Sequence, residues 1–390
     1  MIKFIDTFKK RESEPDKSMI SYLKEMQLKL SDQLSAIKKI YLDTKYWIYL
    51  REAELGHSDS FNNSQDYKVI LNLLNLLKSL RKNNFVICPI STSLFSEIFK
   101  NKKEKELKIT INLIDELSGG ISIKHNDERT FLELLYFLYS KSQSVDICYP
   151  ASKLVWTKLS LALGSFPPIN LPCSQAQELV IRKAFLDQLW ASRLQDIFET
   201  MGMQNIINMP EMDNISIDLN TDKIKYAEDY STFDELFNIE LIGTLQALNP
   251  IIVKSLRAFN VGIGGTSISD EAIENSEEKK VFVSLLYQSV KTNKSREELP
   301  SIFLPAALHS AIRWDKYRKY KANESYDFLH AECALPYFDF FLTENSLKEL
   351  ITKKSHGFGE IYNCCVIADP VDAFNELLKL STLQNPVNGS

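Results

Sequence analysis

The sequence predicts an α/β fold with a central parallel sheet that is interrupted by a large, mostly helical insertion. Short apolar runs alternate with periodic helical stretches from 37 to 138, and again from 301 to 382. Strands that alternate with helices in this way form parallel sheets whose two faces are both covered. Residues 139–300 show helical stretches and loops but no convincing buried strand, so we expect them to form the insertion.

The composition is that of a globular protein. Of the 390 residues, 44% are hydrophobic and 11% aromatic, which is enough to bury substantial cores. The net charge of −5 argues against indiscriminate binding of polyanions, so a nucleic-acid site has to be a local feature. The six cysteines lack Cys-x-x-Cys spacing, and neither a zinc site nor a disulfide framework is expected. Without a signal peptide or a long apolar run, a cytoplasmic location with no membrane contact is expected.

The amino-terminal elements follow in order. Residues 1–36 carry an amphipathic helix, which we expect to be an arm packed on the body. "KKIYLD" is a predicted buried strand, and "YKVILNLLNLLKSLRK" is a strongly periodic helix. "FVICPIS" is a second strand, followed by the helix "STSLFSEIFK", for which Ser91 or Thr92 can serve as the N-cap. A helix near 102–117, the strand "GISIK" and the helix "ERTFLELLYFLYS" complete this part.

The carboxy-terminal elements resume the alternation. Two helices, "PAALHSAIRWDKYRKYKA" and "SYDFLHAECAL", precede the strand "FDFFLT". The helix "NSLKELITKK", a strand near "IYNCCVIA" and the helix "PVDAFNELLKL" come next, and residues 383–390 form a tail. Residues 37–138 and 301–382 together therefore predict one parallel sheet of about four or five strands.

Four acidic residues are expected at one edge of this sheet. The carboxyl ends of parallel strands meet at one edge, where ligands bind. Asp43 and Glu344 each follow a strand, and Glu97 lies about a turn and a half into the helix after the second strand. Asp327 opens a helix that runs back antiparallel to the strands, so it begins at the same edge. Asp339 is expected at the opposite edge, about 16 Å from Glu344, because five strand residues separate them.

These acids predict a metal site. Clustered carboxylates repel one another unless a cation neutralises them. Mg²⁺ and Mn²⁺ prefer oxygen ligands, and they activate a water or stabilise a leaving oxygen in phosphodiester cleavage. Asp43, Glu97, Asp327 and Glu344 are therefore the candidate catalytic, metal-binding residues. Glu324 is either a fifth ligand or a charge that complements the helix dipole.

The same residues carry a resemblance to a known family. "IYLDTKYWIYL", "VICPISTSLFSEIF" and "YDFLHAECALPYFDFFLTEN" resemble the acidic motifs of PIN-domain nucleases, over about half of the chain. The resemblance implies a PIN-like α/β/α sandwich that coordinates Mg²⁺ or Mn²⁺. It also implies endonucleolytic hydrolysis of RNA or single-stranded nucleic acid, and analogy with the family suggests a toxin or phage-defence effector. Carried over by position, the metal-binding acids are Asp43, Glu97, Asp327 and Glu344.

Two departures from the family pattern bear on activity. Lys45 stands where the family commonly has Asn, and it can either contact a substrate phosphate or neutralise Asp43. The last acid is commonly Asp and is Glu344 here, so activity is expected to be slow, selective or lost if these changes matter. His330 lies one helical turn after Asp327, and it is either a catalytic partner of an acid or phosphate, or a buried structural residue.

A segment rich in basic and aromatic residues precedes Asp327. "RWDKYRKYK" is predicted to continue a helix, and its mixed composition suits a phosphate backbone with unstacked bases. Amphipathic helices also have this composition. The candidate substrate-binding residues of the segment are Arg313, Lys316, Arg318 and Lys319.

A second class of function stays open beside the nuclease. In it, the helical insertion binds another protein and the PIN-like part is only a scaffold for protein or nucleic-acid interactions. Lys45 and the "TEN" ending favour this class, whereas the presence of all four acids favours the enzyme. A homo-oligomer is also left open. A Ser/His/Asp hydrolase is a poorer choice, because no Gly-x-Ser-x-Gly elbow occurs.

Overall fold

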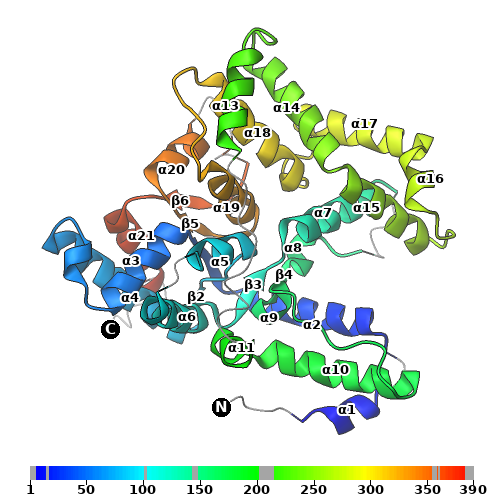
Figure 1. Cartoon of the computed structure of the whole chain (residues 1–390), viewed down its shortest axis with the longest axis horizontal. Coiled ribbons are helices and arrows are strands. Elements are labelled where there is room, and N and C mark those ends of the chain that lie inside the picture. Colours follow the sequence, from blue (N-terminus) through cyan, green and yellow to red (C-terminus); the bar gives the residue numbers. More distant parts are fainter. Residues whose placement is uncertain are drawn as a thin grey trace, which may run out of the picture.

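The computed structural model describes residues 6–14, 17–100, 103–142, 148–201, 215–353, 358 and 361–382. The fold is mixed α/β and mostly helical, with a four-stranded parallel sheet near its centre (Figure 1). The expected tail at 383–390 lies outside the described residues. The α/β class and the parallel sheet that the sequence predicts are therefore confirmed.

The parallel sheet is built from the two predicted halves of the chain. In spatial order its strands are β2 (Val86–Ile87), β1 (Lys38–Leu42), β5 (Phe340–Leu342) and β6 (Cys365–Ile367). In the register, Leu42 pairs with Leu342, and Leu342 pairs with Ile367. Because these three residues are level, the segments that follow β1, β5 and β6 all leave the sheet at one edge.

Two short strands extend the architecture beyond the parallel sheet. β3 (Ile121–Ile123) lies beside the chain that follows β2, through a parallel bridge between Ile90 and Ser122. It also pairs with β4 (Trp156–Lys158) in antiparallel fashion. The prediction of no strand in 139–300 is wrong at this point. β4 has only three residues, which is too short for an alternating or apolar run to stand out in the sequence.

Helices account for most of the remaining residues. In chain order they are α1 (Phe8–Glu12), α2 (Met19–Leu34), α3 (Thr44–Glu54), the 3₁₀ helix η1 (Ser58–Ser60), α4 (Ser64–Lys82), α5 (Thr92–Ile98), α6 (Glu104–Ser118), α7 (Asn126–Lys141), α8 (Ala151–Leu154), α9 (Leu159–Ala162), α10 (Gln175–Ala191), α11 (Leu194–Met201), α13 (Ser216–Lys225), α14 (Phe233–Ala247), α15 (Asn249–Gly262), α16 (Asp270–Glu274), α17 (Glu277–Lys291), α18 (Pro300–Trp314), α19 (Glu324–Tyr337), α20 (Asn345–Thr352) and α21 (Pro370–Thr382). Ile40, Tyr41 and Leu42 are all buried. Since neighbouring strand residues point to opposite faces, both faces of the sheet are covered.

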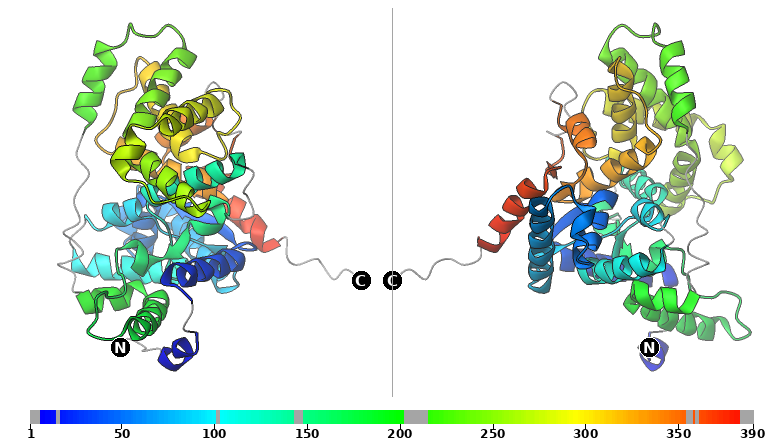
Figure 2. Two further views of the ribbon diagram at one scale, coloured as in Figure 1. Left: turned by 90° about the vertical axis from the view of Figure 1, so that its right-hand side faces the viewer. Right: turned by 60° about the vertical axis from the view of Figure 1, so that its left-hand side comes forward.

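The helices of 139–300 do not form one body. α10 packs against α1 and α2 at one end of the molecule, whereas α14 packs against α18 and α15 against α7 at the other end. Figures 1 and 2 show the two groups on opposite sides of the central part, with α10 at the bottom and α14 at the top of Figure 1. The helices predicted to form a single insertion therefore extend the central α/β part in two directions.

The helices α14 and α15 form a long, bent apolar pair. No single helix among the described residues is long and apolar enough to cross a membrane, whereas this pair, bent by 62°, passes by length and composition. Leu236, Leu241 and Ile252 of the pair are buried in the protein interior. Part of its apolar surface is thus used in packing.

We expect Phe341→Ala to destabilise the protein by about 3–5 kcal/mol. Phe341 is fully buried in β5, and its ring meets the Tyr41 ring at 5.5 Å between centroids, so truncation leaves a cavity in the sheet core. Urea unfolding followed by circular dichroism measures the loss. Phe166→Ala is the control, because Phe166 is 71% exposed and its truncation should cost under about 0.5 kcal/mol. Equal losses for the two variants would contradict the assigned sheet core.

Candidate functional site

Three of the predicted acids lie at the edge where β1 and β5 end. Asp43 directly follows β1, and its backbone N–H donates to the carbonyl of Leu342 at 3.0 Å. Glu344 lies two residues beyond β5 at the start of α20, and Asp327 is in the first turn of α19. We call Asp43, Asp327 and Glu344 the acid rim. The structure thus brings together three segments that are far apart in the sequence.

Asp43 is the most deeply placed member of the acid rim. It is the N-cap of α3, where its Oδ1 accepts a hydrogen bond from the backbone N–H of Tyr46 at 3.2 Å. Only 5% of the residue is exposed. Burial raises the pKa of Asp43 to about 6, and the nearby charge of Glu344 adds to the rise, while His330 opposes it. Asp43 is therefore a carboxyl that lacks sufficient positive charge around it.

Asp327 has the more strongly shifted pKa. Burial raises the pKa of Asp327 to about 7, and His330 only partly offsets this effect. The charges of Glu324, Glu344 and Asp43 each raise it further. The acids of the rim are thus close enough to repel one another, as the sequence analysis predicts for a shared edge.

Glu97 reaches the same region but has a different environment. Its Oε2 accepts a hydrogen bond from Nε2 of His330 at 3.0 Å and another from the Thr44 hydroxyl. Burial alone would raise the pKa of Glu97, but the hydrogen bond and charge of His330 outweigh burial, so the pKa is lowered. Glu97 is therefore an ionised carboxylate that the protein itself already holds in place.

His330 is a buried connecting residue. It is 2% exposed, and its Nδ1 lies 2.8 Å from the Tyr41 hydroxyl, which in turn lies 2.7 Å from Oγ of Ser91. Because Glu97 accepts from Nε2, we assign a proton to Nε2, while Nδ1 is engaged by the Tyr41 hydroxyl. Both ring nitrogens are thus engaged, which places His330 behind Glu97 and makes it an orienting group.

Glu324 is held by a basic partner. Arg318 Nη2 lies 2.8 Å from its Oε1, and the backbone N–H of Lys321 donates to Oε2. Glu324 is almost fully buried in this arrangement. Of the two alternatives that the sequence leaves open, the fifth ligand is disfavoured, because Arg318 already neutralises this carboxylate.

The basic segment differs from its prediction. α18 ends at Trp314, so the residues after it are not a continuation of the helix. The Asp315 carboxylate accepts from the backbone of Tyr317 and forms a local turn, while Lys223 of α13 donates to the carbonyls of Ile312 and Asp315 at 2.7 and 2.6 Å. The helical prediction is wrong here because a lysine from a distant helix binds the carbonyls that would otherwise continue α18.

The four predicted basic contacts fall into two pairs. Arg313 forms an ion pair with Glu240 of α14, and Arg318 pairs with Glu324. Lys316 and Lys319 are exposed in the loop between α18 and α19. Lys321, the last residue of the segment, is exposed as well, and none of these three lysines forms an ion pair within the described part of the chain.

Lys45 lies on α3, two residues after Asp43. Its ammonium is 5.6 Å from the centre of the Tyr49 ring, a cation–π contact, and the side chain is half-buried. No ion pair joins Lys45 to Asp43 within the residues that the structure describes. The alternative in which Lys45 neutralises Asp43 is therefore disfavoured, and contact with a substrate stays a prediction.

Asp369 is a further acid at this edge that the sequence analysis missed. It follows β6, and its Oδ1 accepts from the backbone N–H groups of Val371 and Asp372 at 2.8 and 3.1 Å. After burial, the charges of Asp43 and Asp369 both raise the pKa of Tyr46, which places that ring near both acids. The pattern "CVIADP", a strand followed by Asp, is the same signal that identified Asp43.

The carboxylate oxygens of the acid rim are suitable ligands for a hard cation, but their positions in the structure do not form a metal site. Among the described residues, no group of three His, Cys, Asp or Glu side chains is arranged to hold a metal ion. The acid rim nevertheless offers carboxylate oxygens that repel one another, which is the ligand type of Mg²⁺ and Mn²⁺. Metal binding would therefore require the acid-rim side chains to close around the ion.

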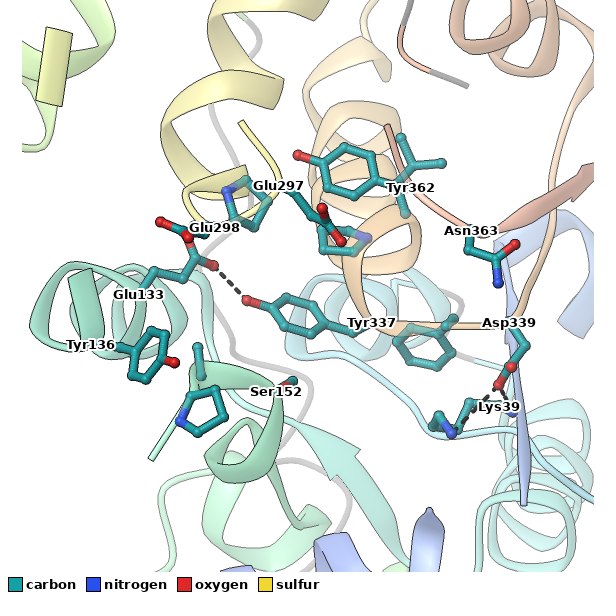
Figure 3. A pocket seen from close by; sticks show the side chains of 16 residues that line it. Lys39, Glu133, Tyr136, Ser152, Glu297, Glu298, Tyr337, Asp339, Tyr362 and Asn363 are labelled. Carbon is teal, nitrogen blue, oxygen red and sulfur yellow. Dashed lines mark hydrogen bonds and ion pairs between the residues drawn. The ribbon is translucent and has the colours of Figure 1, made fainter. Parts of the chain in front are cut away.

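The opposite edge of the sheet has separate chemistry. There Asp339, at the edge where the sequence places it, pairs with Lys38 at 2.7 Å and accepts from the backbone of Lys39, so it is a structural residue. A cavity of about 580 Å³ opens beside it. Figure 3 shows Glu133 from α7 meeting the hydroxyl of Tyr337 in this cavity, at 2.6 Å. Lys39, Asp339 and Asn363, near the amino ends of β1, β5 and β6, line part of this cavity, which does not include the acid rim.

Comparisons with known proteins add nothing to the resemblance that the sequence carries. No family model, no curated protein and no solved structure matches this chain. The resemblance to PIN-domain nucleases therefore rests on three motifs and their order. The geometry of the acid rim is the independent ground for a function.

We expect Asp327→Asn to stabilise the metal-free protein at pH 8 by roughly 1–2 kcal/mol. The folded-state pKa of about 7 lies above the ordinary 3.8. Between these values the folded protein holds more protons than the unfolded chain, so stability falls as pH rises through this window. Asp327→Asn has no carboxyl group to deprotonate at this position, so its stability does not fall for this reason. Urea unfolding of variant and parent at pH 4 and pH 8, in chelator, measures it.

Asp339→Asn is the matched control for this experiment. Burial raises the pKa of Asp339, but hydrogen bonds from Lys38 and the backbone of Lys39 outweigh burial and lower it. Its contribution is therefore present at neutral pH and lost in acid, so the control should be destabilised at pH 8. Parallel pH profiles for Asp327→Asn and the parent would show that Asp327 is not strained.

Proposed function

We propose that the acid rim binds Mg²⁺ or Mn²⁺ and that the protein hydrolyses phosphodiester bonds of RNA or single-stranded nucleic acid. The observation that carries this proposal is the convergence of Asp43, Asp327 and Glu344 at one sheet edge, where burial raises the pKa values of Asp43 and Asp327 and neighbouring acids raise them further. Strained acids of this kind gather at functional sites. A bound divalent ion would supply charge to a leaving oxygen and acidify a water.

The chain's own residues would have separate tasks. Asp43, Asp327 and Glu344 would hold the ion. Glu97, ionised and oriented by His330, would accept a hydrogen bond from the attacking water and align it with the phosphate. Tyr41 fixes the far side of the His330 ring at 2.8 Å, so the direction in which Glu97 points is set by the protein interior.

A noncatalytic interaction module is the second candidate. It is favoured by the lack of an assembled three-ligand metal group among the described residues. Apolar side chains are also exposed on the distal helices and their loops, where Val261 is 50%, Ile263 51% and Val281 66% exposed. These side chains would offer a partner protein a contact surface. In this case the acid rim would be a remnant without a ligand.

We expect Asp43→Asn and Asp327→Asn each to abolish cleavage of a single-stranded RNA that depends on Mg²⁺ or Mn²⁺. Losing a metal ligand removes the charge that binds the ion, so rates should fall by at least about 100-fold. Gel assays with labelled RNA, with and without chelator, measure the loss. Asp339→Asn should cleave like the parent, because Asp339 lies at the opposite edge.

Calorimetric titration with Mn²⁺ separates the two candidate functions. The nuclease requires saturable Mn²⁺ binding that Asp43→Asn weakens and Asp339→Asn does not. If the parent binds no Mn²⁺ and cleaves no RNA, the interaction module is the better assignment. If the parent cleaves RNA and both acid-rim variants do so equally fast, the site lies elsewhere.

We expect Lys316→Gln with Lys319→Gln to weaken RNA binding and to flatten its salt dependence. Both lysines are exposed beside the segment that leads to Asp327, whereas Arg318 is held by Glu324. Losing two phosphate contacts should reduce the slope of log affinity against log salt by about 1.4. Fluorescence anisotropy across a salt series measures both effects. Lys9→Gln with Lys10→Gln, exposed on α1, is the control, and an equal slope change there would refute this path.

A further inference from the structure

A small cavity lies next to the acid rim, on the side of α3 and α21. Its volume is about 240 Å³, and its lining includes Lys45, Tyr49, Phe61, Asn62, Asp66 and Asp369. Drug-sized ligands occupy cavities of roughly 300–1,000 Å³, so this one suits a single ring system. It is open to solvent on the side of Asn62 and Asp369, which are both exposed.

Two aromatic rings form one wall of the cavity. Tyr49 on α3 and Phe61, just after η1, lie 5.8 Å apart between ring centroids at an angle of 48°. Phe61 is supported from behind by Tyr67 of α4 at 5.5 Å. Both cavity rings are half-buried, so each is held by packing and still has an accessible surface. Rings that are fixed and accessible in this way are platforms for flat aromatic ligands.

The positive and negative charges around the rings lie on different parts of the cavity lining. Lys45 stands over Tyr49 at 5.6 Å from its centroid, on the first turn of α3, which Asp43 caps. Asp66 and Asp369 lie on other parts of the lining, and both are oriented by local bonds: Asn63 donates to Asp66 at 3.1 Å, and Asp369 caps α21. A phosphate is therefore favoured at Lys45 and repelled elsewhere, whereas amino groups on a ring would meet acceptors.

We propose that this cavity is a nucleotide subsite, in which one base of a single strand stacks on Tyr49 and meets Phe61 with its edge while Lys45 binds its phosphate. The subsite rests on the proposed function, because it names how the same edge of the sheet selects its substrate. Lys45 follows Asp43 by two residues on the first turn of α3. The strand would thus pass from the subsite directly across the acid rim.

The first turn of α3 connects the subsite to the acid rim, because it runs from Asp43 through Lys45. Tyr46 anchors this turn, since its hydroxyl donates to the carbonyl of Ala368 at 3.0 Å and its side chain is buried. The subsite is therefore rigid on the side that faces the acid rim. A base held there would place the neighbouring phosphate at a constant offset from Asp43, which favours cleavage at one position relative to the bound base.

The test uses single-stranded RNA hexamers that carry one abasic nucleotide at each position in turn. Binding is measured by fluorescence anisotropy in chelator, so that no cleavage takes place. We expect one abasic position to weaken binding to the native protein by about 5- to 150-fold, the range for loss of one stacked base. Tyr49→Leu should weaken binding of the intact hexamer by a similar factor and should show no further loss at that position.

Three further variants serve as controls for this experiment. Tyr49→Phe keeps the ring and should restore most of the affinity that Tyr49→Leu loses. Phe61→Leu gives an independent reading from the second ring in case Tyr49→Leu fails to fold. Phe166→Leu, which alters an exposed aromatic residue elsewhere, should leave the abasic profile of the parent.

The outcomes separate the subsite from the proposed function. If RNA is cleaved with Mn²⁺ but neither ring variant changes the abasic profile, the subsite is wrong and the nuclease stands. If the ring variants remove the sensitivity at one position while Asp43→Asn leaves metal-dependent cleavage intact, the subsite stands and the acid-rim assignment is wrong. Absence of any hexamer binding by the native protein overturns the subsite directly.

Discussion

The buried hydrogen-bond chain from Ser91 through Tyr41 and His330 to Glu97 is the constraint on which the functional edge depends. It joins β1, α5 and α19 with links of 2.7, 2.8 and 3.0 Å. Each link satisfies a polar group that would cost roughly 1–3 kcal/mol if it were buried alone. Because Asp43 follows β1 and Asp327 precedes His330 by one turn, the same chain positions two acid-rim segments.

Four acids near the ends of the sheet differ in whether the fold gives them a basic or hydrogen-bonding partner that lowers the pKa. Glu97 and Asp339 have lowered pKa values, because His330 and Lys38 outweigh the effect of burial. Asp43 and Asp327 have raised values, because burial and neighbouring acids outweigh the help of His330. At the edge where β1 and β5 end, the fold thus leaves the buried Asp43 and Asp327 short of positive charge, so a cation would be stabilised there.

The distal helices act on the site through the segment between α18 and α19. Lys223 of α13 ends α18 by binding its carbonyls, and Arg318 then reaches Glu324 at the start of α19. The first turn of α19, which contains Asp327, is therefore anchored to a helix that lies far away in the sequence. Residues that look like an appended insertion thus help to set the position of one acid of the rim.

The sequence by itself determined the strands other than β4, most helices and the edge at which the acids gather. The signals for these features are local: an apolar run followed by Asp43, and the period of "YKVILNLLNLLKSLRK". Only the tertiary structure decided that β4 pairs with β3, that α18 ends at Trp314, and which acids have partners. Contacts such as Arg318 with Glu324 or His330 with Glu97 depend on where elements pack, and packing between distant segments leaves no periodic trace in the chain.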